Sequence, residues 1–390
     1  MSRFLLGINY WPRSSAMYMW QRFDIQEIGD DIARIKELGL DVVRFFLMWE
    51  AFQPEHNAMD AQALRRFDAV IEKIAAAGLR AMPTLFCGHM SGVNWLPAWT
   101  LEREPTQGRF RTIAGGNIVD RSIGDFYADP DLLRAQVFFA RRVGERVRDN
   151  PAILAWDLGN EFSNLRLPAT PNDAAQWSAR LTDALVEASG APVTAGMHGE
   201  DLGQDRRLRP SSVAVPWAFA TMHGYSVYST FARDRLDSNC VPFLCQLQQS
   251  FSRKAVLFTE LGNPQCPPGQ NKVDGFACLQ EDEMAPYARG AIDRLHARGA
   301  LGAFWWCWAD YDPSLADLPP FDRAPHELRF GIIGSDGSFK PVAQALAQFA
   351  REARTVVTPL PAPIADETEH YAGLPQSIER EYRAYCDAYA

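Results

Sequence analysis

The feature that most constrains this chain is a unit that recurs along it: an amphipathic helix, a glycine and then a short apolar run. In its first copy, apolar residues at helical spacing over residues 28–38 precede Gly39 and the run VVRFFLMW. The same order returns three more times, with the glycine at Gly78, Gly190 and Gly299. Strands that alternate with helices predict parallel pairing within one sheet.

Eight apolar runs have the length and composition of strands, beginning near residues 4, 42, 80, 153, 192, 219, 255 and 301. Their near-continuous apolar character predicts burial on both faces. The sequence therefore predicts an α/β protein with a (β/α)8 TIM barrel. An open doubly wound sheet is the alternative, but the Gly-rich phosphate loop that follows its first strand is missing.

Two regions depart from the repeat. About 65 residues separate the third and fourth runs, and a loop of that length inside a compact domain usually carries function. At the other end of the chain, a Pro-rich stretch over residues 359–363 leads to a predicted helix over residues 377–389. We therefore assign residues 1–355 to a catalytic barrel with elaborated βα loops, and residues 356–390 to a helical extension packed on that barrel.

Composition narrows the class of protein. The 390 residues are 47% hydrophobic, which is enough for a sizeable core, and the net charge of −9 argues against a nucleic-acid partner. The opening MSRFLLGINYW lacks the apolar run of a signal peptide, and no segment approaches the roughly 20 apolar residues of a membrane span. Seven cysteines without a CxxC pair indicate reduced thiols. We predict a cytoplasmic protein with no membrane partner, and its oligomeric state stays open.

Two glutamates stand where apolar runs end: Glu161 after the fourth and Glu260 in the seventh. An ionisable group at the end of an apolar strand is costly unless it faces a polar cavity. The C-terminal ends of barrel strands meet at one mouth, where side chains from opposite sides can approach each other. Glycoside hydrolysis with retention needs two carboxyl groups about 5–5.5 Å apart. The sequence thus predicts a catalytic carboxylate pair, with rim salt bridges as the alternative.

The order of motifs along the chain resembles clan A of the glycoside hydrolases, and specifically family 5. The family has Asn-Glu at the end of strand four and Glu at the end of strand seven, as Asn160, Glu161 and Glu260 stand here. Five further motif positions of the family follow the same order, and they correspond to Arg44, His89, His223, Tyr225 and Trp306. The resemblance spans essentially the whole barrel.

This resemblance implies that Glu161 is the general acid/base and Glu260 the nucleophile. Arg44 and Tyr225 are expected to hydrogen-bond the ionised Glu260, and Asn160 to bind the 2-hydroxyl of the sugar. Because Glu161 must begin protonated, burial and the charge of Glu260 are expected to raise its pKa. His89 and His223 are expected to contact substrate.

The remaining candidates are aromatic and acidic residues near strand ends. Trp306 is expected to form an apolar floor for the sugar ring, with Trp305 and Trp308 as competitors. Asn9 ends the first strand and is a further possible sugar contact. Three other acids follow strands without matching a motif, namely Glu50, Glu200 and Asp310. The seven histidines show no HxxxH or carboxylate-clustered pattern, so no metal or other cofactor is expected.

Two segments bear on the substrate. NYWPRSSAMYMW and WWCWADYDPSL resemble the β-mannosidase-type branch of family 5. Together with loops that could block one end of a cleft, they imply a retaining exo-β-mannosidase that acts on short manno-oligosaccharides or glycan fragments through a covalent glycosyl-enzyme. The alternatives are an endo-β-mannanase or cellulase, a β-galactosidase of the same clan, and a catalytically inactive carbohydrate-binding barrel.

Overall fold

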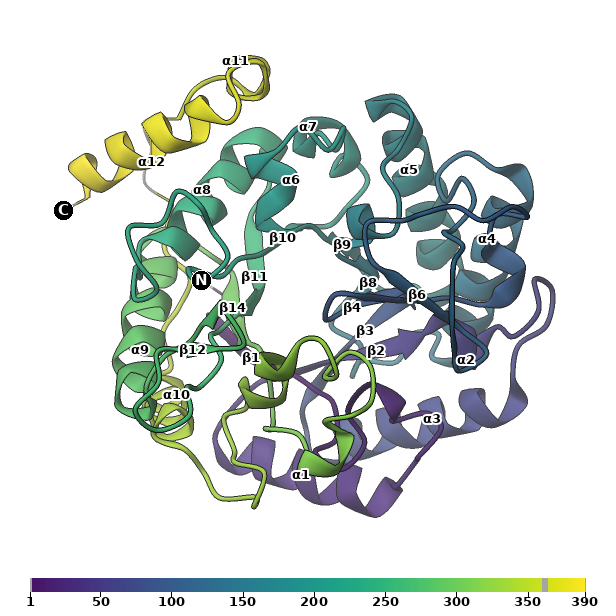
Figure 1. Cartoon of the computed structure of the whole chain (residues 1–390), viewed down its shortest axis with the longest axis horizontal. Coiled ribbons are helices and arrows are strands. Elements are labelled where there is room, and N and C mark those ends of the chain that lie inside the picture. Colours follow the sequence, from purple (N-terminus) through teal and green to yellow (C-terminus); the bar gives the residue numbers. More distant parts are fainter. Residues whose placement is uncertain (1, 360–363, 390) are drawn as a thin grey trace.

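The computed structural model describes residues 2–359 and 364–389, and its centre is a barrel of eight parallel strands (Figure 1). The strands follow the order β10-β11-β14-β1-β2-β3-β8-β9, and β9 and β10 meet through a bridge between His198 and His223. Their bounds are β1 Leu5–Asn9, β2 Val42–Met48, β3 Arg80–Cys87, β8 Trp156–Asn160, β9 Val193–Gly196, β10 Ala220–His223, β11 Val256–Leu261 and β14 Gly302–Trp305. The predicted (β/α)8 barrel is confirmed.

Helices surround the barrel (Figure 1). The long ones are α1 Ile25–Glu37, α3 Ala61–Ala76, α4 Pro130–Arg146, α5 Pro171–Ser189, α8 Cys240–Ser252, α9 Glu281–Ala297 and α10 Pro341–Arg351. Short ones are α2 Trp49–Phe52, α6 Gly199–Gly203, α7 Pro210–Val213 and the 3-10 turns Ala16–Tyr18, Ala98–Thr100, Phe162–Asn164, Pro313–Leu315 and Pro325–Arg329.

Local signals account for several helix boundaries. Asp24 caps α1 by accepting hydrogen bonds from the backbone of Gln26 and Glu27, and Thr170 with Asp173 forms a capping box at α5. The glycines that end the repeat all have a positive φ, as at Gly190, where φ is 72°. Glycine adopts this left-handed conformation without the steric cost that other residues bear. These signals explain why the helix–glycine–strand repeat could be read from the sequence.

A small apolar cluster fills the barrel interior near the N-terminal ends of the strands. It consists of Val42, Met82, Leu257 and Phe304. Gly7 of β1 allows the ring of Phe304 into this space, because a Cβ at this position would lie only 2.4 Å from the ring. The cluster closes one end of the barrel, so polar side chains can gather only at the other end.

The long connection between β3 and α4 is more ordered than a loop. It contains a four-stranded sheet of β4 His89–Met90, β5 Val93–Trp95, β6 Arg111–Ala114 and β7 Asn117–Val119. Strands of two to four residues are too short to show a periodic pattern, which is why the sequence predicted a loop here. This sheet stands beside the mouth of the barrel, because His89 follows directly from the C-terminal end of β3.

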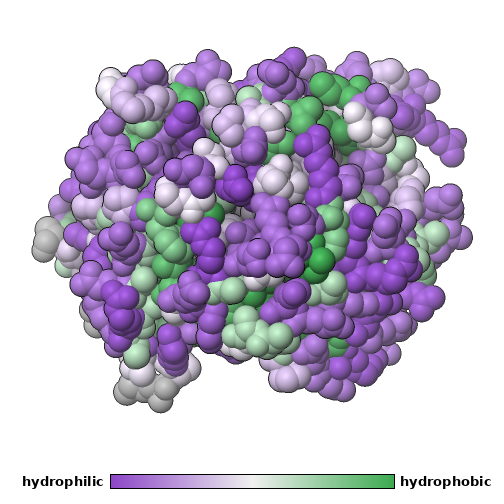
Figure 2. Space-filling model, turned by 90° about the horizontal axis from the view of Figure 1, so that it is seen from below, coloured by the Kyte–Doolittle hydropathy of each residue, from purple (hydrophilic) through white to green (hydrophobic). Residues whose placement is uncertain are grey.

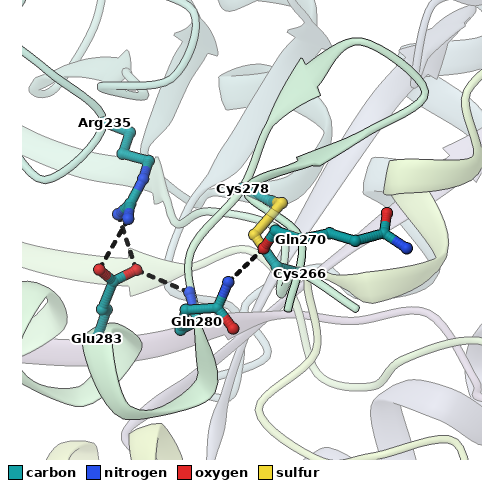
Figure 3. Close-up of a disulfide and its surroundings, with 6 residues drawn as sticks. All are labelled: Arg235, Cys266, Gln270, Cys278, Gln280 and Glu283. Carbon is teal, nitrogen blue, oxygen red and sulfur yellow. Dashed lines mark hydrogen bonds and ion pairs between the residues drawn. A yellow bond between two sulfur atoms is a disulfide. The ribbon is translucent and has the colours of Figure 1, made fainter. Parts of the chain in front are cut away.

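The prediction of reduced cysteines is wrong for one pair. Cys266 and Cys278 form a disulfide that closes the hairpin of β12 Lys272–Val273 and β13 Phe276–Ala277 (Figure 3). The two cysteines are 12 residues apart and match no known motif spacing. Because the chain has an odd number of cysteines, the sequence did not indicate that any two of them pair. The other five cysteines are free thiols: Cys87, Cys240, Cys245, Cys307 and Cys386. Figure 3 also shows Glu283, at the start of α9, paired with Arg235 from the connection between β10 and α8.

The C-terminal helices α11 Glu367–Ala372 and α12 Gln376–Ala388 lie outside the ring of barrel helices, next to α8 (Figure 1). Of the predicted Pro-rich stretch, residues 360–363 lie outside the described residues. Within the described ranges, no helix is long and apolar enough to cross a membrane. The face seen in Figure 2 is largely hydrophilic, with apolar residues gathered in separate patches.

Candidate active site

The barrel brings the two predicted glutamates together. One carboxylate oxygen of Glu161, one of Glu260 and a ring nitrogen of His223 all lie within 4.8 Å of one another. The parallel ladders are interrupted near these residues, between Asp157 and Asn160 in β8, Met222 and His223 in β10, and Phe258 and Leu261 in β11. Such irregularities re-aim side chains next to functional sites, and here they occur where three strands reach the mouth.

Glu260 is held from both sides. Nη1 of Arg44 donates to its Oε1 at 2.6 Å, and the hydroxyl of Tyr225 donates to its Oε2 at 2.7 Å. Burial and the nearby carboxylates raise the pKa of Tyr225 well above its usual value, so this hydroxyl keeps its proton. Each carboxylate oxygen of Glu260 thus accepts one hydrogen bond, from the two residues expected from the sequence.

Arg44 is fully buried, and two further buried side chains, Asp157 and Asn9, hold its guanidinium in place. Asp157 Oδ2 accepts from Nη2 at 2.7 Å and from Nε at 3.0 Å, and Asn9 Oδ1 accepts from Nη1 at 2.8 Å. Burial lowers the pKa of Arg44, but the charges of Asp157 and Glu260 outweigh it and raise that pKa. The guanidinium is therefore a fixed positive charge beneath Glu260. The sequence signal for this support is Asp157 itself, because it is an acid inside the apolar run ILAWDLGNE.

Glu161 follows β8 in a left-handed conformation, with φ 47° and ψ 46°. This conformation is uncommon for a residue with a side chain, and it turns the carboxylate toward the cavity. Its Oε1 lies 3.2 Å from His223 Nδ1, and its Oε2 accepts from Asn164 Nδ2 at 3.2 Å and lies 3.9 Å from His198 Nδ1. Asn164 and His198 were not predicted, because both stand in connections after the strands.

The expectation that Glu161 has a raised pKa is wrong for the free protein. Burial raises the pKa of Glu161, but His198, His223 and His89 act against it and hold it below its usual value. Burial also lowers the pKa of His89 to about 4, so at neutral pH that ring is uncharged. The Glu161 carboxylate is therefore held between two histidine rings, 3.2 Å from His223 Nδ1 and 3.9 Å from His198 Nδ1.

The two glutamates open into a cavity of about 720 Å³. Of the six predicted substrate contacts, five line this cavity, and the sixth, Arg44, hydrogen-bonds Glu260. The five are His89, Asn160, His223, Tyr225 and Trp306. Trp305 and Trp308 are not among its lining residues, so Trp306 is the one of the three tryptophans that reaches the cavity, and its role as a sugar platform stays a prediction.

The amide of Asn160 and the ring of His89 are fixed by neighbours. Asn160 Oδ1 accepts from Arg44 Nη2 at 3.0 Å, and its Nδ2 donates to the carbonyl of His89 at 3.2 Å. His89 Nδ1 lies 2.8 Å from Asn94 Oδ1, and its ring packs against Phe110 with centroids 4.5 Å apart. Both side chains are pre-positioned, so little conformational entropy is lost when a ligand binds.

A further carboxyl in the cavity was missed. Glu327 belongs to the 3-10 turn Pro325–Arg329, and its Oε2 accepts from Ser91 Oγ at 2.9 Å. Burial, together with the charges of Glu260 and Glu161, raises the pKa of Glu327 to about 7. Nothing in the segment RAPHELRF marks this glutamate, because its position depends on a turn between β14 and α10.

The three acids set aside in the sequence have different environments. Glu200 lines the cavity and pairs with Arg109. Glu50 accepts from the backbone of Gly115, and Asp310 pairs with Lys340 at 2.6 Å, and neither of the two reaches the cavity. Of these three acids, only Glu200 is part of the cavity wall.

Glu161, His223 and Glu260 together have the donor types of a metal site, with all three donor atoms within 4.8 Å. Arg44 already lies 2.6 Å from Glu260 and supplies the positive charge that a metal ion would bring. A divalent ion at the same oxygens would be repelled by this guanidinium.

Comparisons with known proteins agree with this fold. The GH5_18 protein of Streptomyces cattleya, solved with GlcNAc, superimposes with a TM-score of 0.81 at 23% identity, over 99% of this chain and 91% of that one. The exo-beta-1,4-mannosidase Op5Man5 of Opitutaceae bacterium strain TAV5 gives a TM-score of 0.74 at 26% identity, over 90% of this chain and 59% of that one. The resemblance to glycoside hydrolase family 5 is confirmed.

Other matches point to the same clan. A family model described as beta-galactosidase (Glyco_hydro_42) matches residues 17–178, and it is a clan A relative of family 5. The beta-galactosidase of Halorubrum lacusprofundi superimposes with a TM-score of 0.66 at 17% identity, over 93% of this chain and 60% of that one. Curated protein sequences give no match. The neighbours are glycoside hydrolases, which supports a glycosidase and leaves the sugar open.

Proposed function

We propose that this protein is a retaining β-glycosidase in which Glu260 is the nucleophile and Glu161 the general acid/base. The observation that carries the proposal is the approach of one oxygen from each carboxylate to within 4.8 Å inside a single cavity. This spacing suits direct attack by one carboxylate, because an inverting enzyme needs about 6.5–9.5 Å for an intervening water. The two glutamates have different partners, which is why we assign them different roles. Arg44 and Tyr225 donate hydrogen bonds to Glu260 and stabilise its negative charge, as a nucleophile requires.

In the first step, a Glu260 oxygen bonds to the anomeric carbon as the bond from this carbon to the leaving oxygen breaks. The leaving oxygen takes a proton from Glu161. The rings of His223 and His198, 3.2 Å and 3.9 Å from the Glu161 carboxylate, fix the orientation in which it delivers this proton. As Glu260 becomes an ester, its charge vanishes, and Glu161 then accepts a proton from the water that hydrolyses this ester.

We further propose that the substrate is a short β-mannoside cleaved from its non-reducing end. Support comes from the described activity of Op5Man5 and from a variant of the Streptomyces cattleya protein solved with Manβ1-4GlcNAc. The cavity is bounded by the β4–β7 sheet on one side and by the β12–β13 hairpin on another, which favours exo action over the endo-mannanase or cellulase alternative. A β-galactoside is the second candidate, because the matching family model is a beta-galactosidase model.

The inactive-barrel alternative loses support because both carboxylates have the partners that catalysis requires. A cytoplasmic location stays a prediction. The disulfide between Cys266 and Cys278 weakens its cysteine argument, since disulfides persist mainly in oxidising compartments.

A panel of nitrophenyl β-glycosides tests the substrate. We expect kcat/KM to be highest for the mannoside, and we expect Glu260→Ala to lose this activity. A preference for the galactoside by tenfold or more would refute the mannosidase assignment and leave the roles of the two glutamates intact. Absence of hydrolysis of every glycoside by the folded wild-type protein would refute the glycosidase itself.

Glu327 is expected to bind a sugar hydroxyl, because its carboxyl is buried, lines the cavity and is held there by hydrogen bonds from Ser91 Oγ and the Trp306 side chain. Hydrogen bonds to a charged group contribute about 1.5–3 kcal/mol, so Glu327→Gln should lower kcat/KM by roughly 10- to 100-fold. With a pKa of about 7, the carboxylate forms as the pH rises through 7 and is lost below it. The wild-type KM should therefore rise as the pH falls through 7.

The Gln variant should show no such step in its KM, because its side chain does not titrate. Ser91→Ala is the control: it removes the neighbouring hydroxyl and keeps the carboxylate, so its effect should be smaller. An unchanged kcat/KM in Glu327→Gln would show that this carboxyl does not contact substrate.

A further inference from the structure

The C-terminal helices are joined to α6 by buried hydrogen bonds. His370 of α11 is fully buried; its Nδ1 lies 2.9 Å from Glu381 Oε2 of α12, and its Nε2 lies 2.8 Å from the carbonyl of Leu202 in α6. The hydroxyl of Tyr371 lies 2.8 Å from the carbonyl of Asp201 and 3.0 Å from that of Leu208, and it donates between these two acceptors. Buried polar contacts of this kind are specific, since a lost partner leaves an unsatisfied group. The extension is thus fixed to one particular helix of the barrel mouth.

Asp201 connects this anchor to the general acid/base. Its carbonyl accepts from Tyr371, while its buried carboxylate accepts from Ser163 Oγ at 2.6 Å and from the backbone of His198 at 3.0 Å. Ser163 Oγ also lies 3.0 Å from His198 Nε2. The other ring nitrogen of His198 lies 3.9 Å from Glu161. One residue therefore separates the extension from the histidine that acts on Glu161.

The second helix of the extension borders the cavity itself. Pro375, Ile378 and Glu379 line it, and Ile378 packs near Gly203, where a Cβ would lie 3.7 Å from its Cδ1. The hydroxyl of Tyr382 donates to Asp237 at 2.5 Å and anchors the same helix to the segment before α8. Gly203 belongs to α6, whose N-cap His198 lies 3.9 Å from Glu161, so this border adjoins the helix that neighbours the general acid/base.

We infer that α11 and α12 are a working part of the active site, in which Tyr371 is a positioning residue for His198 and Glu161, and Ile378 borders the space for the leaving group. The inference rests on the proposed function. It also predicts a specific signature: a loosened α6 should impair proton donation and leave nucleophilic attack by Glu260 unaffected. Glu260, Arg44 and Tyr225 have no contact with the extension among the described contacts.

Tyr371→Phe tests the inference, since it removes one hydroxyl and keeps the ring. The kcat/KM values are compared for two substrates of the glycone that wild type prefers: a β-1,4-linked disaccharide with GlcNAc as leaving group, and a dinitrophenyl glycoside whose leaving group needs no proton. We expect kcat/KM of the variant to fall about tenfold for the disaccharide, because a misplaced catalytic group lowers the rate of the step it serves. For the dinitrophenyl glycoside, kcat/KM should fall less than twofold.

Tyr385→Phe is the matched control, because Tyr385 lies on α12 with its hydroxyl 3.4 Å from Arg298 and away from α6. It should change neither value. Equal losses on both substrates in Tyr371→Phe, or no loss on either, would overturn the inference. Should Tyr371→Phe fail to fold, Ile378→Ala is measured instead: it should raise the KM of the disaccharide alone, and an unchanged KM would overturn the inference. Wild-type protein inactive on both substrates would instead refute the proposed function.

Discussion

Glu260→Ala should lower kcat by about 10⁵-fold, because removal of a nucleophile abolishes the covalent route and leaves only substrate binding and polarisation. The loss should be similar for good and poor leaving groups, since attack on the anomeric carbon precedes every product. Steady-state kinetics with a nitrophenyl glycoside and with a disaccharide measure it.

Azide should restore part of this activity. The anion fits the space left by the carboxylate, next to the positive charge of Arg44, and bonds to the anomeric carbon as the leaving oxygen departs. The product should be the α-glycosyl azide. Arg44 keeps its bond to Asp157 in the variant, so the fold should persist and the Tm should change little.

Glu50→Ala is the matched control, because Glu50 follows β2 at the same mouth and does not reach the cavity. Its kcat should equal that of wild type. Residual activity of Glu260→Ala above about one hundredth of wild type, without azide, would exclude Glu260 as the nucleophile, since loss of a nucleophile costs far more than this.

Glu161→Ala should produce a loss that depends on the leaving group. General acid catalysis contributes about 10²–10⁴-fold, so kcat/KM for a disaccharide should fall by roughly 10³-fold. For a dinitrophenyl glycoside the loss should stay below about tenfold, because this leaving group departs as an anion. A series of aryl glycosides with graded leaving-group pKa values measures this dependence.

Two further observations separate Glu161 from Glu260. In Glu161→Ala, azide should attack the glycosyl-enzyme from the vacated side and give the β-glycosyl azide. The basic limb of the pH profile, which reports the general acid, should also disappear. A loss that is uniform across the aryl series would contradict the general acid role.

Much of the fold was predictable because its signals are local. Helical periodicity, capping residues such as Asp24 and glycines with a positive φ such as Gly190 each act within a few residues. The same holds for Glu161 and Glu260, which are recognisable as acids that end apolar strands. The sheet within the β3–α4 connection and the pair Cys266–Cys278 were missed because short strands and isolated cysteines carry no periodic signal.

The environment of the site was harder to predict, because it depends on which connections meet over the barrel. Glu327 reaches the cavity from the turn after β14, and His198 from the start of α6. The direction of the pKa shift of Glu161 was wrong for this reason: burial was foreseeable from the sequence, whereas the approach of His198 was not.

Product stereochemistry is the most direct test of the central claim that Glu161 and Glu260 act together in a two-step displacement. Hydrolysis of the preferred β-glycoside is followed by ¹H NMR at high enzyme concentration, so that cleavage is faster than mutarotation. We predict that the β-anomer of the free sugar appears first and that the α-anomer follows by mutarotation. First appearance of the α-anomer would show inversion and would contradict the account.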